Sequence, residues 1–298
     1  MRLLLFALLA APALAADPAA AAVAFLAREV PAWQSENHCF SCHNNGDGAR
    51  ALLLARARGR AVPSGALADS LSWLRRPEAW EKAANPAFSD VKLARIQFSA
   101  ALAEAVRDGL STARPDLARA AEALLPLQDS SGAWKIDTGG VAGAAATYGA
   151  TLATYQARRV LETAGPRRYQ AAILGANRWL ETSTPENVLD RAALLLALPE
   201  TASRHLAPLL TAQNGDGGWG PQFHAPSEAF DTAIVLLALD SVHEGGGAIS
   251  RGRAFLARFQ LADGSWPETT RPSGLTSYAE RISTAAWALC ALLAGDGK

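Results

Sequence analysis

Residues 39–43 carry the pattern with the most specific chemistry in the sequence. Cys39 and Cys42 are separated by two residues and His43 follows directly, which gives Cys-x-x-Cys-His. This spacing is the attachment signature of c-type haem, in which two thiols form thioethers with the porphyrin vinyl groups and the adjacent imidazole ligates the iron. The pattern therefore predicts one covalent haem c on Cys39 and Cys42, with His43 as the proximal iron ligand.

Three other chemistries fit the same residues. Cys39 and Cys42 could form a disulfide in an oxidising compartment, with His43 incidental. Zinc could bind Cys39, Cys42 and His43, but it would need a fourth ligand. A redox-active dithiol would need a thioredoxin-type strand-to-helix context, which the neighbouring sequence lacks. Cys290 lies in an apolar helical stretch and is expected to be a buried free thiol.

The second axial position of such a haem has few candidate ligands. The lone methionine is Met1, which a cleaved leader would remove, so a His/Met cytochrome is not expected. His224 precedes an inner-type helix and is the best remote candidate, whereas His205 and His243 are expected to be solvated or capping residues. Tyr148, a lysine or water stay open as ligands. Five-coordinate iron with an open site would favour oxygen, peroxide or small-ligand chemistry, and iron ligated by two histidines would favour electron transfer.

A second set of polar residues falls near the starts of expected inner helices, where it would line a central cavity. Within this set, Asp231, Arg281 and Tyr148 are the candidates for catalysis. Asp231 could pair with Arg281, although a lone Asp at this position is also typical of a helix N-cap. The full set is Asp90, Tyr148, Asp190, Arg191, Asp231, Tyr278 and Arg281.

Charge and hydropathy exclude several classes of protein. The 298-residue chain has 28 basic and 28 acidic residues, so it lacks the positive charge of a nucleic-acid binder. Arg2, the apolar run that follows it, and the small-x-small pattern at 13–15 predict a signal peptide over residues 1–15. The mature chain, which has no further membrane-spanning stretch, is then expected in the periplasm or otherwise exported.

A repeated loop indicates how these groups are positioned. Three loops with Gln, Gly and Trp at fixed spacing begin at Gln128, Gln213 and Gln260, and residues 44–48 repeat the Asn-Gly-Asp-Gly of the second loop. In such a loop the Asp is expected to form a turn, the Gly to adopt a positive φ, and the Trp to pack between repeats. The Gln amide is expected to bond backbone groups of the next helix.

Apolar residues at helical spacing predict six pairs of helices between these loops, and no sheet. One domain is expected over residues 16–298. The expected helices cover residues 18–30, 48–59, 64–76, 89–108, 115–127, 141–163, 167–182, 186–198, 201–212, 226–242, 248–260 and 275–294.

The Gln-x-x-x-Gly-x-Trp loops, with helices such as residues 231–239 after them, resemble the QW repeats of squalene–hopene cyclases and related prenyltransferase-type toroids. The resemblance covers most of the mature chain and implies an all-α (α/α)6 toroid around a central cavity. The resemblance predicts the activity less firmly than the fold. The cyclases' Asp-x-Asp-Asp motif is missing, and Asp231 has no acidic neighbour. The zinc ligands of protein prenyltransferases and the thioester motif of complement-like toroids are missing as well.

These observations lead to one main hypothesis and two alternatives. The main hypothesis is an exported monohaem c-type protein on a cyclase-like toroid, acting in electron transfer or haem-based redox chemistry. The first alternative is an isoprenoid-binding or terpenoid-cyclising enzyme, whose cavity should be large and apolar. The second is a non-catalytic scaffold with a Cys39–Cys42 disulfide. The expected partner is a redox protein or a small apolar molecule, and no nucleic acid is expected.

Overall fold

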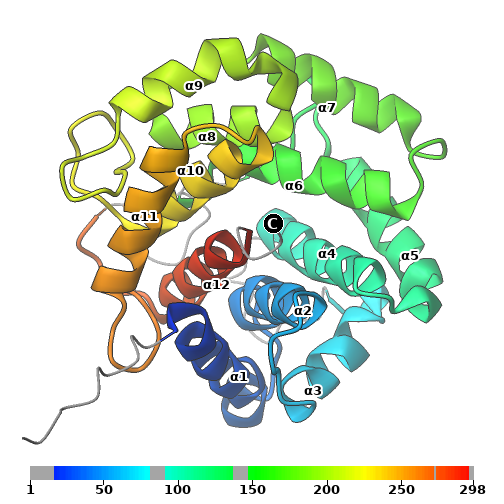
Figure 1. Cartoon of the computed structure of the whole chain (residues 1–298). Coiled ribbons are helices and arrows are strands. Elements are labelled where there is room, and N and C mark those ends of the chain that lie inside the picture. The colour runs from blue at the N-terminus through cyan, green and yellow to red at the C-terminus, as the bar shows by residue number, and fades with distance from the viewer. Residues whose placement is uncertain (1–16, 81–90, 137–146, 272, 295–298) are drawn as a thin grey trace, which may run out of the picture.

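The fold is described here from a computed structural model that covers residues 17–80, 91–136, 147–271 and 273–294. Within these residues the chain forms twelve α-helices and no β-strand. The helices lie in two concentric rings (Figure 1). The prediction of an all-α toroid built from six helical pairs is therefore confirmed. The predicted signal peptide and Asp90 lie outside the described residues.

Six helices form the inner ring. Each contacts the next one in the ring, and α12 contacts α2, so the ring closes. Burial on nearly every side explains why the sequences of α10 and α12 are apolar almost throughout. No described helix combines the length and apolar character needed to cross a membrane. The inner helices are α2 (Ala49–Ala57), α4 (Val91–Arg107), α6 (Gly149–Ala164), α8 (Val188–Ala197), α10 (Ala229–Ser241) and α12 (Tyr278–Ala294).

Six helices form the outer ring and pack one apolar face against the inner ring. Their amphipathic pattern follows from this position, because the opposite face meets solvent. The outer helices are α1 (Pro18–Asn37), α3 (Gly65–Leu74), α5 (Arg114–Leu124), α7 (Gln170–Thr182), α9 (Ala202–Thr211) and α11 (Gly246–Phe259). Short 3-10 helices cover Pro77–Ala79, Ser111–Ala113, Leu125–Leu127 and Pro199–Thr201.

The three Gln/Trp loops act as identical clamps between neighbouring outer helices. In the second loop, the Gln213 side chain donates to the carbonyls of Gly217 (2.8 Å) and of Ala248 in α11 (2.9 Å). The fully buried Trp219 donates from Nε1 to the Leu209 carbonyl in α9 (2.7 Å). The loops that begin at Gln128 and Gln260 have the same bonds. The loop Asp residues accept backbone N–H bonds within the turn, as predicted.

The third clamp joins the two ends of the toroid. Gln260 Nε2 donates to the carbonyl of Pro18, at the start of α1, over 2.8 Å. Trp266 from the same loop is fully buried and donates to the Leu256 carbonyl in α11. The last outer helix, α11, is thereby bonded to the first, α1. The outer ring is closed by the same type of Gln/Trp loop that joins other neighbouring outer helices.

Two local expectations were wrong. The first outer helix does not end before Pro31 but continues to Asn37, because its packing against α12, α3 and α2 outweighs the missing backbone N–H. Residues 44–48, which were expected to form a turn like that of the second loop, do not form one. They belong to a π-helix, η1 (Cys42–Gly48), that runs directly into α2. This segment has neither the Gln nor the Trp that holds the true loops in place.

Candidate functional site

The Cys-x-x-Cys-His segment leads into the start of an inner helix. Ser41 caps η1, and its hydroxyl accepts from the backbone N–H groups of His43 (3.2 Å) and Asn44 (3.5 Å). A Cβ at Gly46 would lie 2.8 Å from the Gln97 Cβ, and one at Gly48 would lie 2.9 Å from Val30. The two glycines therefore serve close packing rather than a turn. π-helical segments of this kind are frequent at functional sites.

Asp47 is the hub of a buried polar network at this position. Its side chain is fully buried. One carboxylate oxygen accepts from Gln97 Nε2 and from Ser283 Oγ, both over 2.8 Å, and the other accepts from the Tyr148 hydroxyl over 3.4 Å. The Arg50 guanidinium lies 4.0 Å away. These groups come from η1, α2, α4 and α12 and from the residue that precedes α6, so the network spans the centre of the inner ring.

His43 is linked to this network. Its Nδ1 lies 2.7 Å from Ser283 Oγ, which in turn donates to Asp47. Burial lowers the pKa of His43, and the nearby Asp47 charge opposes that effect. The imidazole is therefore held in one orientation and is disposed to stay neutral.

The cysteines correct two of the alternatives drawn from the sequence. Cys39 and Cys42 are both partly exposed and neither is in a disulfide, so the structure does not support the alternative of a Cys39–Cys42 bridge. Across the described residues, no three His, Cys, Asp or Glu side chains converge to hold a metal ion. The zinc alternative on Cys39, Cys42 and His43 is therefore not supported. A haem needs a single protein ligand on its proximal side, so this finding does not test the haem prediction.

Three aromatic rings adjoin the Asp47 network through Tyr148 and Arg50. The Tyr148, Phe230 and Trp287 rings contact one another with centroid separations of 5.8–6.2 Å. The Arg50 guanidinium lies 4.1 Å from the centroid of the Trp287 ring. Tyr148, predicted as a candidate from the sequence, thus lies in the centre, and burial with the Asp47 charge raises its pKa well above the usual value.

Glu280 is a buried acid that the sequence prediction did not include. Ser277 and Glu280 match a capping box, in which the Glu normally folds back onto the cap's backbone N–H. Here Glu268 accepts that N–H instead, over 3.3 Å, and the Glu280 carboxyl group lies near Thr147. Burial, reinforced by the charge of Asp47, raises the pKa of Glu280 to about 8. A carboxyl group in this state holds its proton at neutral pH.

Asp231 is fully buried at the start of α10, but its predicted partner was wrong. It pairs with Arg271 over 2.7 Å, and Arg271 also pairs with Glu228 over 2.6 Å. Arg281 instead bonds to Asp263 in the third Gln/Trp loop over 2.8 Å, so it supports that clamp. Burial raises the pKa of Asp231 to about 7 against the opposing attraction of Arg271.

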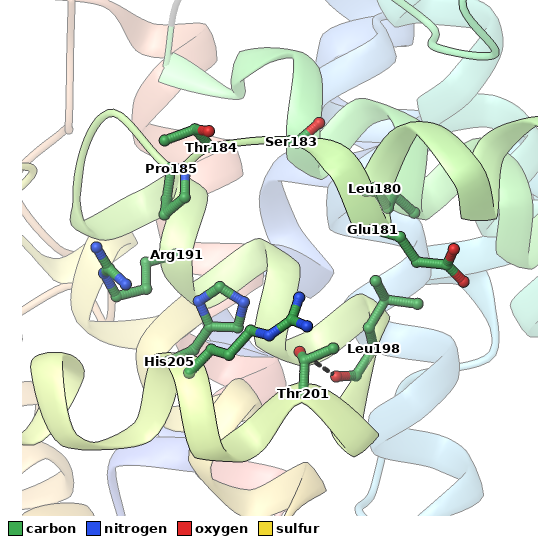
Figure 2. A pocket seen from close by; sticks show the side chains of 10 residues that line it. Leu180, Glu181, Ser183, Thr184, Pro185, Arg191, Leu198, Thr201 and His205 are labelled. Atoms are coloured by element: carbon green, nitrogen blue, oxygen red, sulfur yellow. Dashed lines mark hydrogen bonds between the residues drawn. The ribbon is translucent and has the colours of Figure 1, made fainter.

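Arg191 lies away from the centre. With His205 it lines an outer cleft of about 260 Å³ between α7, α8 and α9 (Figure 2). The expectation that Arg191 lines the central cavity is therefore wrong. His205 was expected to be a solvated or capping residue, but it is buried, with no hydrogen-bond partner for Nδ1 among the described residues. This cleft is small, is lined partly by charged side chains, and shares no residue with the Asp47 network, so it is not the large apolar cavity expected for an isoprenoid-cyclising enzyme.

The remaining predicted residues lie in varied surroundings. Tyr278 is 40% exposed, stacks on Trp33, and bonds to Glu29 and to Asn44 at the edge of the network. Asp190 lies in the first turn of α8, where its backbone N–H donates to the side chain of the capping residue Asn187 over 2.7 Å. The Asp190 carboxylate accepts from the Thr151 hydroxyl over 2.9 Å. The structure places three further residues. His224 is exposed in the loop before α10, with a φ of 64°, His243 follows the end of α10 with a φ of 56°, and Cys290 is buried in α12, as expected.

The sequence contained weak signals for the residues that were missed. Asp47 lies between two glycines, a pattern that is read first as a turn. Glu280 and Ser283 lie three residues apart at the start of a strongly apolar helix, where an acidic residue is read first as part of a cap. Polar residues at the starts of several inner helices, considered together, would have indicated a shared buried network.

Comparisons with known proteins give a likeness in fold and one short matching stretch. No family model matches the chain. A curated drimenyl diphosphate synthase from Streptomyces showdoensis is 40% identical over 67 residues, which is 22% of this chain and 13% of that protein. The solved structure of ent-copalyl diphosphate synthase from Streptomyces platensis aligns with 82% of this chain and 50% of its own, with a TM-score of 0.52 and 21% identity.

The chain thus has a terpenoid-cyclase-like helical fold, and it spans about half of the solved structure that it matches. Neither relative is named as a haem protein. The likeness therefore favours the isoprenoid-cyclising alternative over the main hypothesis of haem electron transfer.

Proposed function

We propose that the chain is an isoprenoid-binding enzyme of the terpenoid-cyclase type, in which a buried carboxylic acid protonates an alkene. The observation that carries this proposal is the Glu280 carboxyl group, which is buried in the inner ring and has a pKa raised to about 8. An acid that stays protonated at neutral pH in an apolar environment can act as a general acid. The terpenoid-cyclase-like fold supports the same class of chemistry.

The aromatic rings near Glu280 provide the second requirement of this chemistry. Protonation of an alkene creates a carbocation, and aromatic faces attract cations through their π electrons. Trp287 lies seven residues after Glu280 on α12, and therefore on the same face of that helix. Its ring contacts those of Tyr148 and Phe230. The acid and the aromatic cluster therefore belong to one region of the inner ring.

Glu280 fits the role of proton donor better than Asp231 does. Both carboxyl groups have raised pKa values. However, Asp231 is ion-paired with Arg271, whose positive charge favours the ionised form of the carboxyl group. Arg271 also lowers the pKa of Glu280, but burial and the negative charge of Asp47 outweigh that effect, and Glu280 has no ion pair among the described residues. Its protonated form is therefore the more strongly favoured, which offers an alternative to the missing Asp-x-Asp-Asp motif.

The test is turnover of isoprenoids in heavy water. The purified protein is incubated in D₂O with farnesyl diphosphate, geranylgeranyl diphosphate or squalene, and the extracted products are analysed by mass spectrometry. We expect a cyclised product that carries deuterium at the protonated carbon. Glu280→Gln should reduce turnover by about 100-fold or more, the usual size of a general-acid contribution. Turnover of the wild-type protein should fall as pH rises through about 8.

The matched control is Glu200→Gln, which neutralises an exposed glutamate on the outer side of the fold. It should turn over substrate at the wild-type rate. Circular dichroism of each variant checks that the fold is retained. Failure of the wild-type protein to convert any of the three substrates would overturn the proposal, and so would full activity in a folded Glu280→Gln variant.

A further inference from the structure

The proposed cyclase chemistry does not use the Cys-x-x-Cys-His segment. The segment forms the link between α1 and η1: His38 ends α1 in a left-handed conformation, and Cys42 begins η1. Both cysteines are partly exposed and outside any disulfide. Two thiols at this spacing, accessible to a ligand and beside a fixed imidazole, need an explanation of their own.

The hydrogen bonds of His43 determine which of its nitrogens carries the proton. Asp47 accepts from Gln97 and from the Ser283 hydroxyl on the same carboxylate oxygen. Because Ser283 gives its single hydrogen to Asp47, its oxygen is an acceptor toward His43 Nδ1. His43 is therefore protonated on Nδ1 and has a lone pair on Nε2. Within the described residues, Nε2 has no hydrogen-bond partner.

This arrangement matches that of an imidazole that ligates a metal. A metal-binding histidine usually donates from its second nitrogen to a carboxylate or another acceptor, which fixes the tautomer and strengthens the ligand. Here the acceptor is Ser283, which is polarised by a buried carboxylate. The side chains of the described residues hold Nδ1 and make no hydrogen bond with Nε2, in an imidazole that is 6% exposed.

Flat aromatic surfaces lie next to the same segment. Phe40, inside the motif, stacks on Trp73 with a centroid separation of 4.5 Å and an interplanar angle of 3°. Trp33, near the end of α1, stacks on Tyr278 at 5.5 Å. The indole Nε1 atoms of Trp33 and Trp73 are buried and have no partner among the described residues. The faces of these rings that their stacking partners do not cover, together with the unpartnered N–H donors, suit a large planar ring with acidic side chains.

We propose that Cys39, Cys42 and His43 hold one covalently attached haem c, with His43 Nε2 as the proximal iron ligand. The Cys39 and Cys42 thiols each add across one vinyl group of haem. A sulfur–carbon bond forms at the inner vinyl carbon, the thiol hydrogen moves to the terminal carbon, and the double bond becomes single. Nothing leaves, and no electron is gained or lost. This attachment places the chain outside the cytoplasm, as the leader-like residues 1–15 indicate.

The experiment is intact-mass spectrometry of the full chain under denaturing conditions, combined with visible spectroscopy. The chain is expressed in a bacterium together with c-type cytochrome maturation proteins and a control cytochrome. We expect the mass of the chain after leader cleavage plus one haem, with no hydrogen lost. The double variant C39S/C42S should carry no covalent haem, whereas Cys290→Ser, which alters the buried cysteine outside the motif, should carry one per chain.

Ser283 is the positioning residue in this proposal, and a reduction potential tests its role. Ser283→Ala removes the acceptor of His43 Nδ1–H, so the imidazole should donate less electron density to ferric iron and the potential should rise. Ser99→Ala removes another buried serine hydroxyl, one without a partner in the described part of the chain, and should leave the potential unchanged. An unmodified chain beside a haem-loaded control cytochrome would overturn the proposal, as would haem that dissociates on denaturation. Neither outcome bears on isoprenoid turnover.

Discussion

Replacement of Glu280 by Gln should stabilise the protein at high pH, which is unusual for a substitution in a buried network. The side chain is buried, and burial together with the charge of Asp47 raises its pKa from the ordinary 4.5 to about 8. Gln has nearly the same size as Glu and, like the protonated carboxyl group, is uncharged. The variant therefore removes the titration of this group while most of the packing is retained.

The size of the effect follows from the difference between the folded and unfolded pKa of Glu280. Below pH 4.5 both states hold the proton, and the group contributes its full stability. As pH rises toward 8, the unfolded state releases the proton and the folded state does not, which destabilises the fold by about 1.4 kcal/mol per pH unit. The wild-type protein should lose about 3 kcal/mol by pH 7 and about 5 kcal/mol by pH 9 through this group alone.

Urea denaturation at pH 5, 7 and 9 measures this difference. The free energy of unfolding of Glu280→Gln, relative to the wild-type protein, should increase by several kcal/mol across the series. The exposed Glu200→Gln variant should show a nearly constant difference. A Glu280→Gln difference that stays within about 1 kcal/mol from pH 5 to pH 9 would refute the reasoning, because it would mean that Glu280 is ionised in the folded protein at neutral pH.

Two further predictions concern the Gln/Trp loops. Gly217→Ala should lower the free energy of unfolding by about 2 kcal/mol or more in urea denaturation, because Gly217 has a φ of +92° and a Cβ would lie 2.7 Å from the Arg251 carbonyl oxygen. Gly215→Ala in the same loop meets open space and should change stability by less than about 0.5 kcal/mol. Gln260→Met should speed amide hydrogen exchange in α1, measured by mass spectrometry, because it removes the bond that closes the outer ring. Gln128→Met should leave α1 exchange unchanged, and equal effects of the two variants would count against the clamp.

The fold was predictable because local and repeated signals agree. The loops that begin at Gln128, Gln213 and Gln260 recur with the same residue types, and helical apolar spacing fills the stretches between them. Errors arose where tertiary packing decides the outcome. α1 continues through Pro31 because neighbouring helices bury its apolar face, and residues 44–48 became helical because Gly46 and Gly48 allow α4 and α1 to approach closely.

The centre of the site was harder to predict than the fold. Tyr148 and Asp231 were found because they stand at the starts of expected inner helices. The partner of Asp231 could not be predicted, since it depends on where long side chains reach after folding: Arg281 turns toward a loop, and Arg271 takes its place. Glu280 was missed because Ser277 and Glu280 match a capping box, in which the Glu only completes the helix cap. In the structure Glu268 accepts the Ser277 backbone N–H instead.

Asp47 links the two proposals physically, although neither depends on the other. Its charge raises the pKa of Glu280, and through Ser283 it determines which nitrogen of His43 is protonated. A buried carboxylate is costly unless it is well paired, and Asp47 has three hydrogen-bond donors but an arginine no closer than 4.0 Å. The position therefore retains a net electrostatic influence on its neighbours instead of being neutralised by a tight ion pair. An apolar side chain at this position would leave the Gln97, Ser283 and Tyr148 donors without an acceptor, so Asp47 holds the network together as well as influencing the proton positions of Glu280 and His43.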